Sequence, residues 1–349
     1  MARPVTCWVL DHPAHLQLFH GFLNGGSKMD ILVATRRLEV EAMLTDETSP
    51  LPARETIWVE RPAGAGLLPL QKEWRALRRI RAVRKVLVRR RVLGHPVQRV
   101  ISKGAPLELR AAKRARVRER WYITDTEIHH LAHRLALSAA TDVVVPADWR
   151  EDLDGGFLSA CKKRGTRVHH LEGHLPHAYL QPPHSTLVGS ASRGGAGTGG
   201  GIPQIFHRSL EGGGAHDKAE LVSAVSLIPD LGMKVTTMAE NQPNGDPWGF
   251  PGQLTKFDGV LSESVTVAHE AVCQGVPTLL VSKAQRGFLD PFLGGGLLFQ
   301  IESTVKGPAL NNEVAAWREA VVARMQGGAM PVAWSDVKEQ LEFLWKESP

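Results

Sequence analysis

The sequence predicts an α/β protein built from two doubly wound, Rossmann-type domains, for three reasons. Short apolar runs, typical of strands buried on both faces, alternate with segments whose apolar residues recur at helical spacing. The 349 residues suit two domains of ordinary size, and 43% apolar with 22% charged residues indicates a globular chain. A Gly- and Ser-rich stretch at residues 189–201 has no side chains that build a core, so we predict a loop near the domain boundary, with domains of residues 1–185 and 186–349.

The N-terminal domain starts with a β-α-β-α-β pattern. Its predicted strands are residues 5–10, 30–35, 56–59, 97–101, 121–124 and 142–146. Its predicted helices are residues 16–23, 39–44, 67–93, a segment from 107 onward, and 129–139. Strands and helices that alternate in this way form a parallel sheet with right-handed crossovers.

Polar residues follow several of these strands. His15 ends the turn after the first strand, Lys103 lies in the turn after the fourth, and Asp125 and Glu127 follow the fifth. The carboxyl ends of parallel strands meet at one edge of the sheet, where ligands of such folds bind. We therefore expect the side chains of His15, Asp125 and Glu127 to converge. Asp125 also suits a helix N-cap, and His15 a residue bonded to nearby backbone at the helix start.

The C-terminal domain is organised around a strand-turn-helix-strand unit at residues 257–290. Strands are predicted at 259–261 and 278–281, and Gly275 followed by Pro277 gives the usual stop signal for the helix between them. Ser262, Ser264 and Thr266 lie where that helix begins, so their hydroxyls and the nearby backbone N–H groups suit a phosphate. Glu270 lies one turn into the helix.

This unit resembles the nucleotide-sugar site of GT-B glycosyltransferases and of related sugar-nucleotide epimerases. The resemblance rests on a polar turn, Thr266, Glu270 four residues later, and Gly275-Val276-Pro277 before an apolar strand. The nearest resemblance is to domain of unknown function 354, a GT-B-like family. It implies two domains that face a cleft, a diphosphate at the helix N-terminus, and ribose hydroxyls on Glu270.

The resemblance extends to further patches of the chain. It implies an acceptor-facing role for His15, an acidic residue at Glu127 for general-base work, and an anion contact for Lys103. It also places Arg208, at the end of the strand at 202–206, against a diphosphate. The substrate implied is a nucleoside-diphosphate sugar, most simply a UDP-sugar, with no other cofactor.

One departure from the family pattern leaves the function open. Glycines usually precede the Thr, but Glu263, Ser264 and Val265 stand there, and a carboxylate at Glu263 would repel a diphosphate. The leading interpretation is a metal-independent glycosyltransferase-like protein. The alternatives are a sugar-nucleotide 2-epimerase-like enzyme and a non-catalytic binding protein that kept the fold.

A basic region at residues 67–120 is the strongest charge feature. From Lys72 to Arg120 there are 18 Lys or Arg and 3 acidic residues, a net +15, whereas the remainder carries −9. In the helix at 67–93, one predicted apolar stripe runs through Leu70, Trp74, Leu77, Ile80, Val83 and Leu87. Arg78, Arg81, Arg84 and Lys85 are the candidate anion-binding residues. This pattern favours an anionic membrane surface or a lipid-linked acceptor over nucleic acid, because aromatic residues for base stacking are lacking; a solvated helix face is the alternative.

Several classes of protein are disfavoured. No run of eighteen apolar residues predicts a membrane span, and the N-terminus reads as a strand instead of a signal core. The isolated Cys7, Cys161 and Cys273 show no metal-ligand spacing and predict a reducing, cytoplasmic compartment, with peripheral membrane association through the basic helix. Amphipathic helices are predicted at 313–325 and 334–345, the last of which crosses back to the first domain in many GT-B folds.

Overall fold

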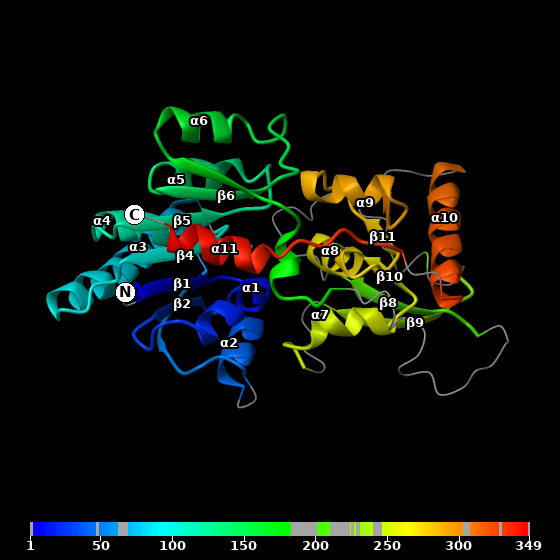
Figure 1. Ribbon diagram of the computed structural model, residues 1–349, viewed down its shortest axis with the longest axis horizontal. Coiled ribbons are helices and arrows are strands. Elements are labelled where there is room, and N and C mark those ends of the chain that lie inside the picture. Colours follow the sequence, from blue (N-terminus) through cyan, green and yellow to red (C-terminus); the bar gives the residue numbers. More distant parts are fainter. Residues whose placement is uncertain are drawn as a thin grey trace. The chain divides into compact units, whose positions relative to one another are not determined.

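A computed structural model of the chain describes residues 3–46, 49–61, 69–182, 201–209, 224, 227, 231–239, 246–302, 308–327 and 330–347. The chain divides into two compact units, Met1–Leu175 and Pro176–Pro349. Each unit is built around one parallel sheet with helices packed against it (Figure 1). The glycine-rich residues 189–200, and most of a helix expected at 218–231, lie outside the described residues.

The N-terminal unit has a seven-stranded sheet in the order β3-β2-β1-β4-β5-β6-β7, with every neighbouring pair parallel. The strands are β1 (Thr6–Leu10), β2 (Ile31–Thr35), β3 (Glu55–Val59), β4 (Arg99–Lys103), β5 (Glu119–Ile123), β6 (Asp142–Pro146) and β7 (Arg167–Leu171). The predicted doubly wound sheet is thus confirmed. Its order reverses between β1 and β4, which makes that position the topological switch point.

Helices cover both faces of this sheet because right-handed crossovers run in two directions from β1. On one face α1 (Pro13–Asn24) packs against α2 (Leu38–Thr45). The other face carries a row of packed helices, seen in Figure 1: α3 (Pro69–Val92), α4 (Pro106–Arg114), α5 (His130–Leu137) and α6 (Phe157–Lys163). β7 is followed by a short 3-10 helix, η1 (Leu175–Ala178).

The apolar stripe predicted for α3 does not form one face of the helix. Ile80, Val83 and Leu87 are at most 3% exposed and belong to the core, but Leu70, Trp74 and Leu77 are 78%, 57% and 42% exposed. The reason is geometric: each residue turns the helix by about 100°, so the three-residue steps from position 77 to 80 and 83 rotate the stripe by about 60° each. The prediction of a single stripe was wrong, and only its second half packs on the sheet.

The C-terminal unit has a five-stranded parallel sheet in the order β12-β11-β10-β8-β9. Its strands are β8 (Gln204–Ser209), β9 (Lys234–Ala239), β10 (Gly259–Ser262), β11 (Thr278–Val281) and β12 (Leu298–Ile301). Its helices are α7 (Phe250–Gln253), η3 (Leu254–Lys256), α8 (Val265–Cys273), η4 (Gly287–Leu289), α9 (Asp290–Gly294), α10 (Pro308–Met325) and α11 (Val337–Lys346). The switch point of this sheet lies between β8 and β10.

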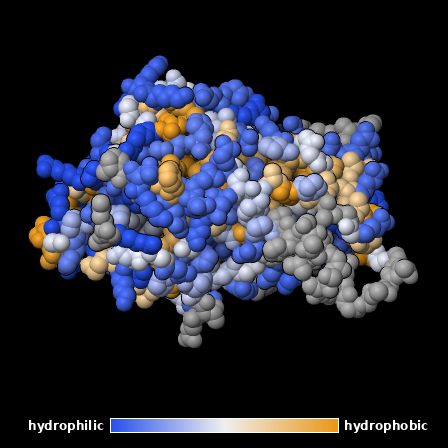
Figure 2. Space-filling view, in the orientation of Figure 1, coloured by the Kyte–Doolittle hydropathy of each residue, from blue (hydrophilic) through white to orange (hydrophobic). Residues whose placement is uncertain are grey.

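The predicted unit around β10 is confirmed, with one addition. α8 stops at Gly275, whose φ of +70° is the left-handed conformation that glycine adopts readily. After β11 the chain forms η4 and α9, because Phe288, Leu289 and Phe292 join the core against α8. The core of each unit is therefore made from strand and helix faces, as the apolar periodicity indicates. Hydrophilic residues cover most of the visible face of the N-terminal unit (Figure 2).

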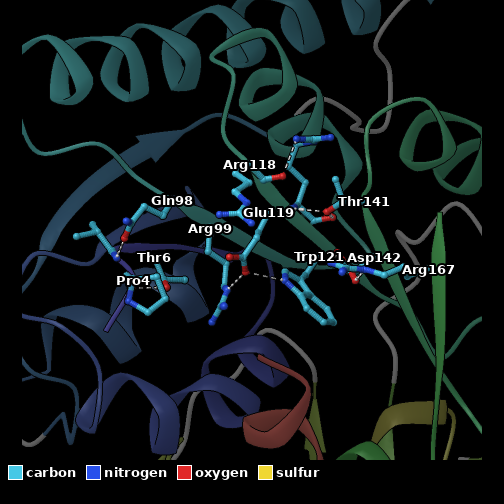
Figure 3. Close-up of polar contacts among 12 residues, drawn as sticks. Pro4, Thr6, Gln98, Arg99, Arg118, Glu119, Trp121, Thr141, Asp142 and Arg167 are labelled. Atoms are coloured by element: carbon cyan, nitrogen blue, oxygen red, sulfur yellow. Dashed lines mark hydrogen bonds and ion pairs between the residues drawn. The ribbon is translucent and has the colours of Figure 1, made fainter. Parts of the chain in front are cut away.

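Ion pairs and hydrogen bonds join the amino ends of β4, β5, β6 and β7 (Figure 3). Arg99 and Glu119 stand opposite each other in the strand register, with Arg99 Nε 2.5 Å from Glu119 Oε2. Asp142 stands opposite Arg167, with the Arg167 Nε 2.7 Å from Asp142 Oδ1. His169 Nε2 lies 3.0 Å from the same carboxylate. The register of neighbouring strands thus places Arg99 beside Glu119 and Asp142 beside Arg167.

Candidate functional site

The candidate site consists of the carboxyl edges of the two sheets, each described within its own unit. In open α/β sheets, ligands bind outside the carboxyl ends of the strands at the point where strand order reverses. Those points are β1/β4 in the N-terminal unit and β8/β10 in the C-terminal unit. His15 and Lys103 flank the first, and Arg208 and Ser262 flank the second. The strand order, which the sequence did not give, therefore places the predicted residues at both switch points.

At the β8/β10 switch point, Arg208 and Ser262 are partners in the strand register. The guanidinium of Arg208 donates to the carbonyl of Ala239, 3.1 Å away at the end of β9, and lies 5.9 Å from the Phe250 ring centroid. The Ser262 hydroxyl is buried; it donates to the Ser264 carbonyl at 2.8 Å and accepts the Ser264 N–H at 3.0 Å. Ser262 therefore shapes the turn before α8, and Arg208 supplies a cation beside it.

Glu263 has a structural contact that explains its place in this turn. Its side chain is 7% exposed, and Oε1 accepts the backbone N–H of Ala224 at 2.9 Å. Its own N–H donates to the Arg208 carbonyl at 3.0 Å, which extends the β8–β10 pairing by one residue. A glycine at position 263 would keep the second contact and lose the first, leaving a buried N–H unpaired.

The first turns of α8 carry the other predicted residues. Ser264 is the N-cap, and Thr266 is exposed in the first turn. The first N–H groups of any helix have no partner within the helix, and they carry the positive end of its dipole. Glu270 is 4% exposed, and its carboxylate accepts a hydrogen bond of 2.7 Å from the hydroxyl of Tyr179. The backbone N–H groups at the start of α8 and the Glu270 carboxylate, which accepts a hydroxyl, thus lie along one helix.

At the β1/β4 switch point, two histidines shape the start of α1. The Nδ1 of His12 accepts the N–H of Ala14, and the Nδ1 of His15 accepts the N–H of Asp11, both at 3.2 Å. A backbone N–H can only donate, so in a neutral ring the proton sits on Nε2. Both imidazoles therefore present an N–H donor. A role for His15 as general base would need the other tautomer.

Both rings are neutral at physiological pH. Burial lowers the pKa of His15 to about 3, and the charge of Lys103 adds to the effect. The pKa of His12 is also lowered, first by burial and then by His15 and Arg37. A desolvated neutral imidazole beside cations is a hydrogen-bond donor for an oxygen-rich or anionic group, and perturbed groups of this kind gather at functional sites.

The carboxylates predicted near this edge differ in accessibility. Asp125 pairs with Lys103, whose Nζ lies 2.9 Å from Asp125 Oδ2, and both side chains keep some exposure, 19% and 16%. Glu127 is fully buried, and its Oε1 accepts the N–H of Arg150 at 3.2 Å. As a general base Glu127 stays a prediction, and a substrate would reach it only if the segment around Arg150 moved.

A buried charged group beneath this edge was missed at the sequence level. Arg79 of α3 ion-pairs with Glu108 of α4, and its Nη2 lies 3.2 Å from Asp11 Oδ1. Burial would raise the pKa of Asp11, but Arg79 and the hydroxyl of Thr35 outweigh it and hold the pKa at about 2. Arg79 lies four residues before the buried Val83, a spacing that places it on the sheet-facing side of α3.

The cations predicted to bind anions on α3 lie apart from that pair. Arg78, Arg81, Arg84 and Lys85 are all exposed. Within the described residues, no three or more His, Cys, Asp or Glu side chains are grouped to hold a metal ion. None of the helices in the described part of the chain is long and apolar enough to cross a membrane.

Comparisons with known proteins agree with the fold. A putative UDP-N-acetylglucosamine 2-epimerase from Listeria monocytogenes superposes with a TM-score of 0.63 at 12% identity, over 99% of this chain and 95% of that one. The Neisseria meningitidis UDP-GlcNAc 2-epimerase bound to UDP-GlcNAc gives 0.59 at 12%, over 98% and 100%. A UDP-glucosyltransferase from Polygonum tinctorium gives 0.57 at 11%, over 100% of both chains.

These likenesses define the class of fold. The chain has two Rossmann-like α/β domains with parallel sheets, the GT-B fold that the sequence predicted. No family model matches the sequence, and no curated protein matches it. The resemblance to domain of unknown function 354 therefore has no support from a family model, and the structural neighbours show the fold.

Proposed function

We propose that the chain binds a nucleoside-diphosphate sugar, most simply a UDP-sugar, at the β8/β10 edge and transfers its sugar to an acceptor held at the β1/β4 edge. The observation that carries the proposal is the position of Arg208, the α8 N-terminus and Glu270 along one switch point. Diphosphate oxygens suit the Arg208 cation and the free N–H groups of a helix start. Ribose hydroxyls suit a buried carboxylate that already accepts a hydroxyl, that of Tyr179.

At the β1/β4 edge, where the acceptor would bind, some side chains are hydrogen-bond donors and another is a proton acceptor. The Nε2–H groups of His12 and His15 and the charge of Lys103 are donors for oxygen atoms. Of the two carboxylates predicted here from the turn after β5, Asp125 is partly exposed and Glu127 is buried, so we assign to Asp125 the acceptance of a hydroxyl proton. His15 then orients the acceptor or stabilises developing charge through Nε2–H. The acceptor class that fits these donors is one with several oxygen atoms, including a lipid-linked phosphate or sugar.

A 2-epimerase on the same edge is the second candidate. Its support is that UDP-GlcNAc 2-epimerases superpose with TM-scores of 0.57–0.63, whereas the glycosyltransferases give 0.54–0.57. Product analysis separates the two chemistries. Release of UDP that depends on an acceptor supports transfer, whereas UDP and free altered sugar without acceptor support hydrolysing epimerase chemistry. Tight binding with neither product and with the nucleotide sugar recovered unaltered leaves a binding protein.

Calorimetry with UDP and a panel of UDP-sugars tests the nucleotide site before the chemistry. We expect micromolar binding of UDP, and Glu270→Gln should weaken it by roughly 1–3 kcal/mol because hydroxyls are left poorly paired. Glu319→Gln, on an exposed position of α10, is the matched carboxylate control and should bind as wild type does. Equal affinity of wild type and the Glu270 variant would remove Glu270 from the site.

Glu263 gives a sharper test of an anionic ligand. Glu263→Gln removes the charge and keeps an oxygen that accepts the Ala224 N–H, so UDP should bind more tightly by about 0.3–1 kcal/mol. Glu263→Gly also removes the charge but strands that N–H, so it should gain less or lose affinity. Weaker binding by the Gln variant would mean that no diphosphate lies at this turn.

His15→Ala tests the acceptor edge once a turnover assay exists. Loss of a positioned donor should lower kcat roughly 100-fold while the affinity for UDP stays unchanged, because His15 belongs to the other unit's edge. His15→Asn, which restores an N–H donor, should recover part of the rate. Full activity of the Ala variant would exclude His15 from the reaction.

A further inference from the structure

The outward side of α3 combines exposed apolar residues with exposed basic residues. We define the α3 outer face as Leu70, Trp74, Leu77, Arg78, Arg81, Arg84 and Lys85. The three apolar residues follow one another at four- and three-residue steps, so they lie on neighbouring positions of one helical side. Their exposures of 78%, 57% and 42% contrast with the 3% or less of Ile80, Val83 and Leu87, which hold the helix on the sheet. Packing therefore uses one side of α3 and leaves the other available.

The basic residues of α3 divide in the same way. Arg79 is buried in its pair with Glu108, and Arg90 pairs with Glu55 at 2.6 Å. Arg78, Arg81, Arg84 and Lys85 are exposed, and none of them forms an ion pair with a carboxylate in the described ranges. The guanidinium of Arg78 lies 5.4 Å from the centroid of the Trp74 ring, so apolar and cationic groups are adjacent. The exposed basic residues of α3 therefore differ from those of a helix surface on which opposite charges pair with one another.

We propose that the α3 outer face docks the protein on the surface of an anionic lipid bilayer. Trp and Leu side chains enter the interface between headgroups and acyl chains, and Arg and Lys side chains contact lipid phosphates. Charge complementarity favours this partner, since four exposed cations surround three exposed apolar residues, one of which is a tryptophan. A nucleic-acid surface would call for several exposed aromatic residues among the cations, and this face has one. The docking does not rest on the proposed sugar chemistry.

Vesicle co-sedimentation tests the docking with the full chain. Wild type should pellet with phosphatidylcholine vesicles that contain phosphatidylglycerol, remain in solution with phosphatidylcholine alone, and be released by salt. Reversing Arg78, Arg81, Arg84 and Lys85 to Glu should lower the partition coefficient at least 100-fold, since each basic residue contributes about fivefold near an anionic surface. The matched control reverses Arg134, Lys162, Lys163 and Arg164, which are equally exposed on and beside α5 and α6 and give the same change in net charge. It should retain most of the binding.

Trp74→Ala separates apolar insertion from electrostatics. We expect roughly tenfold weaker binding to the anionic vesicles with an unchanged salt dependence, because the apolar contribution is lost and the charges remain. The charge-reversed variant should instead lose the salt dependence. Circular dichroism and urea denaturation of every variant report whether the fold is intact, and an intact fold with lost vesicle binding supports the docking even if neither UDP binding nor sugar turnover is found.

Three results would overturn the proposal. Equal pelleting of wild type and the α3 variant would show that lipid does not contact this face. Equal losses in the α3 and control variants would show attraction by net charge alone. If wild type failed to bind vesicles but retarded RNA in a gel, and only the α3 variant lost that retardation, the partner would be a nucleic acid.

Discussion

The two edges of the seven-stranded sheet carry charged residues in opposite arrangements. At the amino edge, the sheet register itself pairs opposite charges, Arg99 with Glu119 and Asp142 with Arg167 (Figure 3). At the carboxyl edge, most charged and titratable groups come from turns and from α3, and Lys103, the last residue of β4, pairs with Asp125 from the turn after β5. There burial and the charge of Lys103 depress the pKa of His15 to about 3.

The difference distinguishes charged groups that stabilise the sheet from groups that suit the binding of a ligand. Opposite charges on neighbouring strands are satisfied by the fold alone and have no need of a ligand. At the carboxyl edge, neutral imidazoles lie beside cations, and such perturbed groups mark places where a ligand completes the set of contacts. The same sheet therefore has an amino edge whose charges are paired by the strand register and a carboxyl edge at which we propose that a ligand binds.

Glu108→Ala should have the largest effect, because it leaves Arg79 buried without its nearer carboxylate. We expect a loss of about 3–5 kcal/mol in the free energy of unfolding, measured by urea denaturation. Glu73→Ala on the exposed side of α3 is the control and should change stability by no more than about 0.5 kcal/mol. Replacing Arg79 and Glu108 together with Met and Leu should recover most of the loss. A loss below about 1 kcal/mol for Glu108→Ala would show that Asp11 alone satisfies Arg79.

Asp142→Asn should cost about 2 kcal/mol, because the fully buried carboxylate accepts bonds from Arg167 and His169. Burial would raise the pKa of Asp142, but these hydrogen bonds outweigh it and lower the pKa below the usual value. A lowered carboxyl pKa gives stability that is complete above the unfolded value of about 3.9 and is lost as pH falls through the folded value. The free energies of unfolding of wild type and variant, measured by denaturation from neutral to acid pH, should therefore converge. Curves that stay parallel would contradict this account of the amino edge.

Lys103→Gln should raise the pKa of His15 by up to about 1 unit, equivalent to about 1.4 kcal/mol, as followed by NMR titration of the imidazole. Two effects act in the same direction: a repelling cation is removed, and Asp125 is released from its ion pair. His207 of the C-terminal unit, whose pKa is lowered by burial, is the internal reference and should keep the pKa that it has in wild type. An unshifted His15 would mean that burial alone sets its pKa.

Thr35→Val should have the smallest effect, about 1 kcal/mol, because an isosteric methyl replaces a hydroxyl that donates to Asp11. The pKa of Asp11 should rise from about 2, since one of the groups that lower it is gone. NMR titration of the carboxyl carbon measures this. If the pKa of Asp11 does not move, Arg79 accounts for the whole stabilisation of the carboxylate.

Much of the fold and of the candidate site follows from local sequence signals. Strands and helices alternate with clear periodicity, and a strand-turn-helix pattern fixes which residues stand at a carboxyl edge. For that reason His15, Lys103, Arg208 and the residues from Ser262 to Glu270 could be placed without coordinates. Gly275 likewise ends α8 as its position before Pro277 predicts, because few other residues adopt a positive φ easily.

What the sequence alone determined is therefore the type and order of the elements and the residues at their ends. Tertiary structure decided contacts between segments far apart in the chain. It set the strand order that makes β1/β4 and β8/β10 switch points, and the bond from Ala224 to Glu263. It also buried Glu127 and left Leu70, Trp74 and Leu77 exposed. The physical reason is that periodicity reports which face of a helix can pack, whereas the neighbour it packs on depends on chain segments tens of residues away.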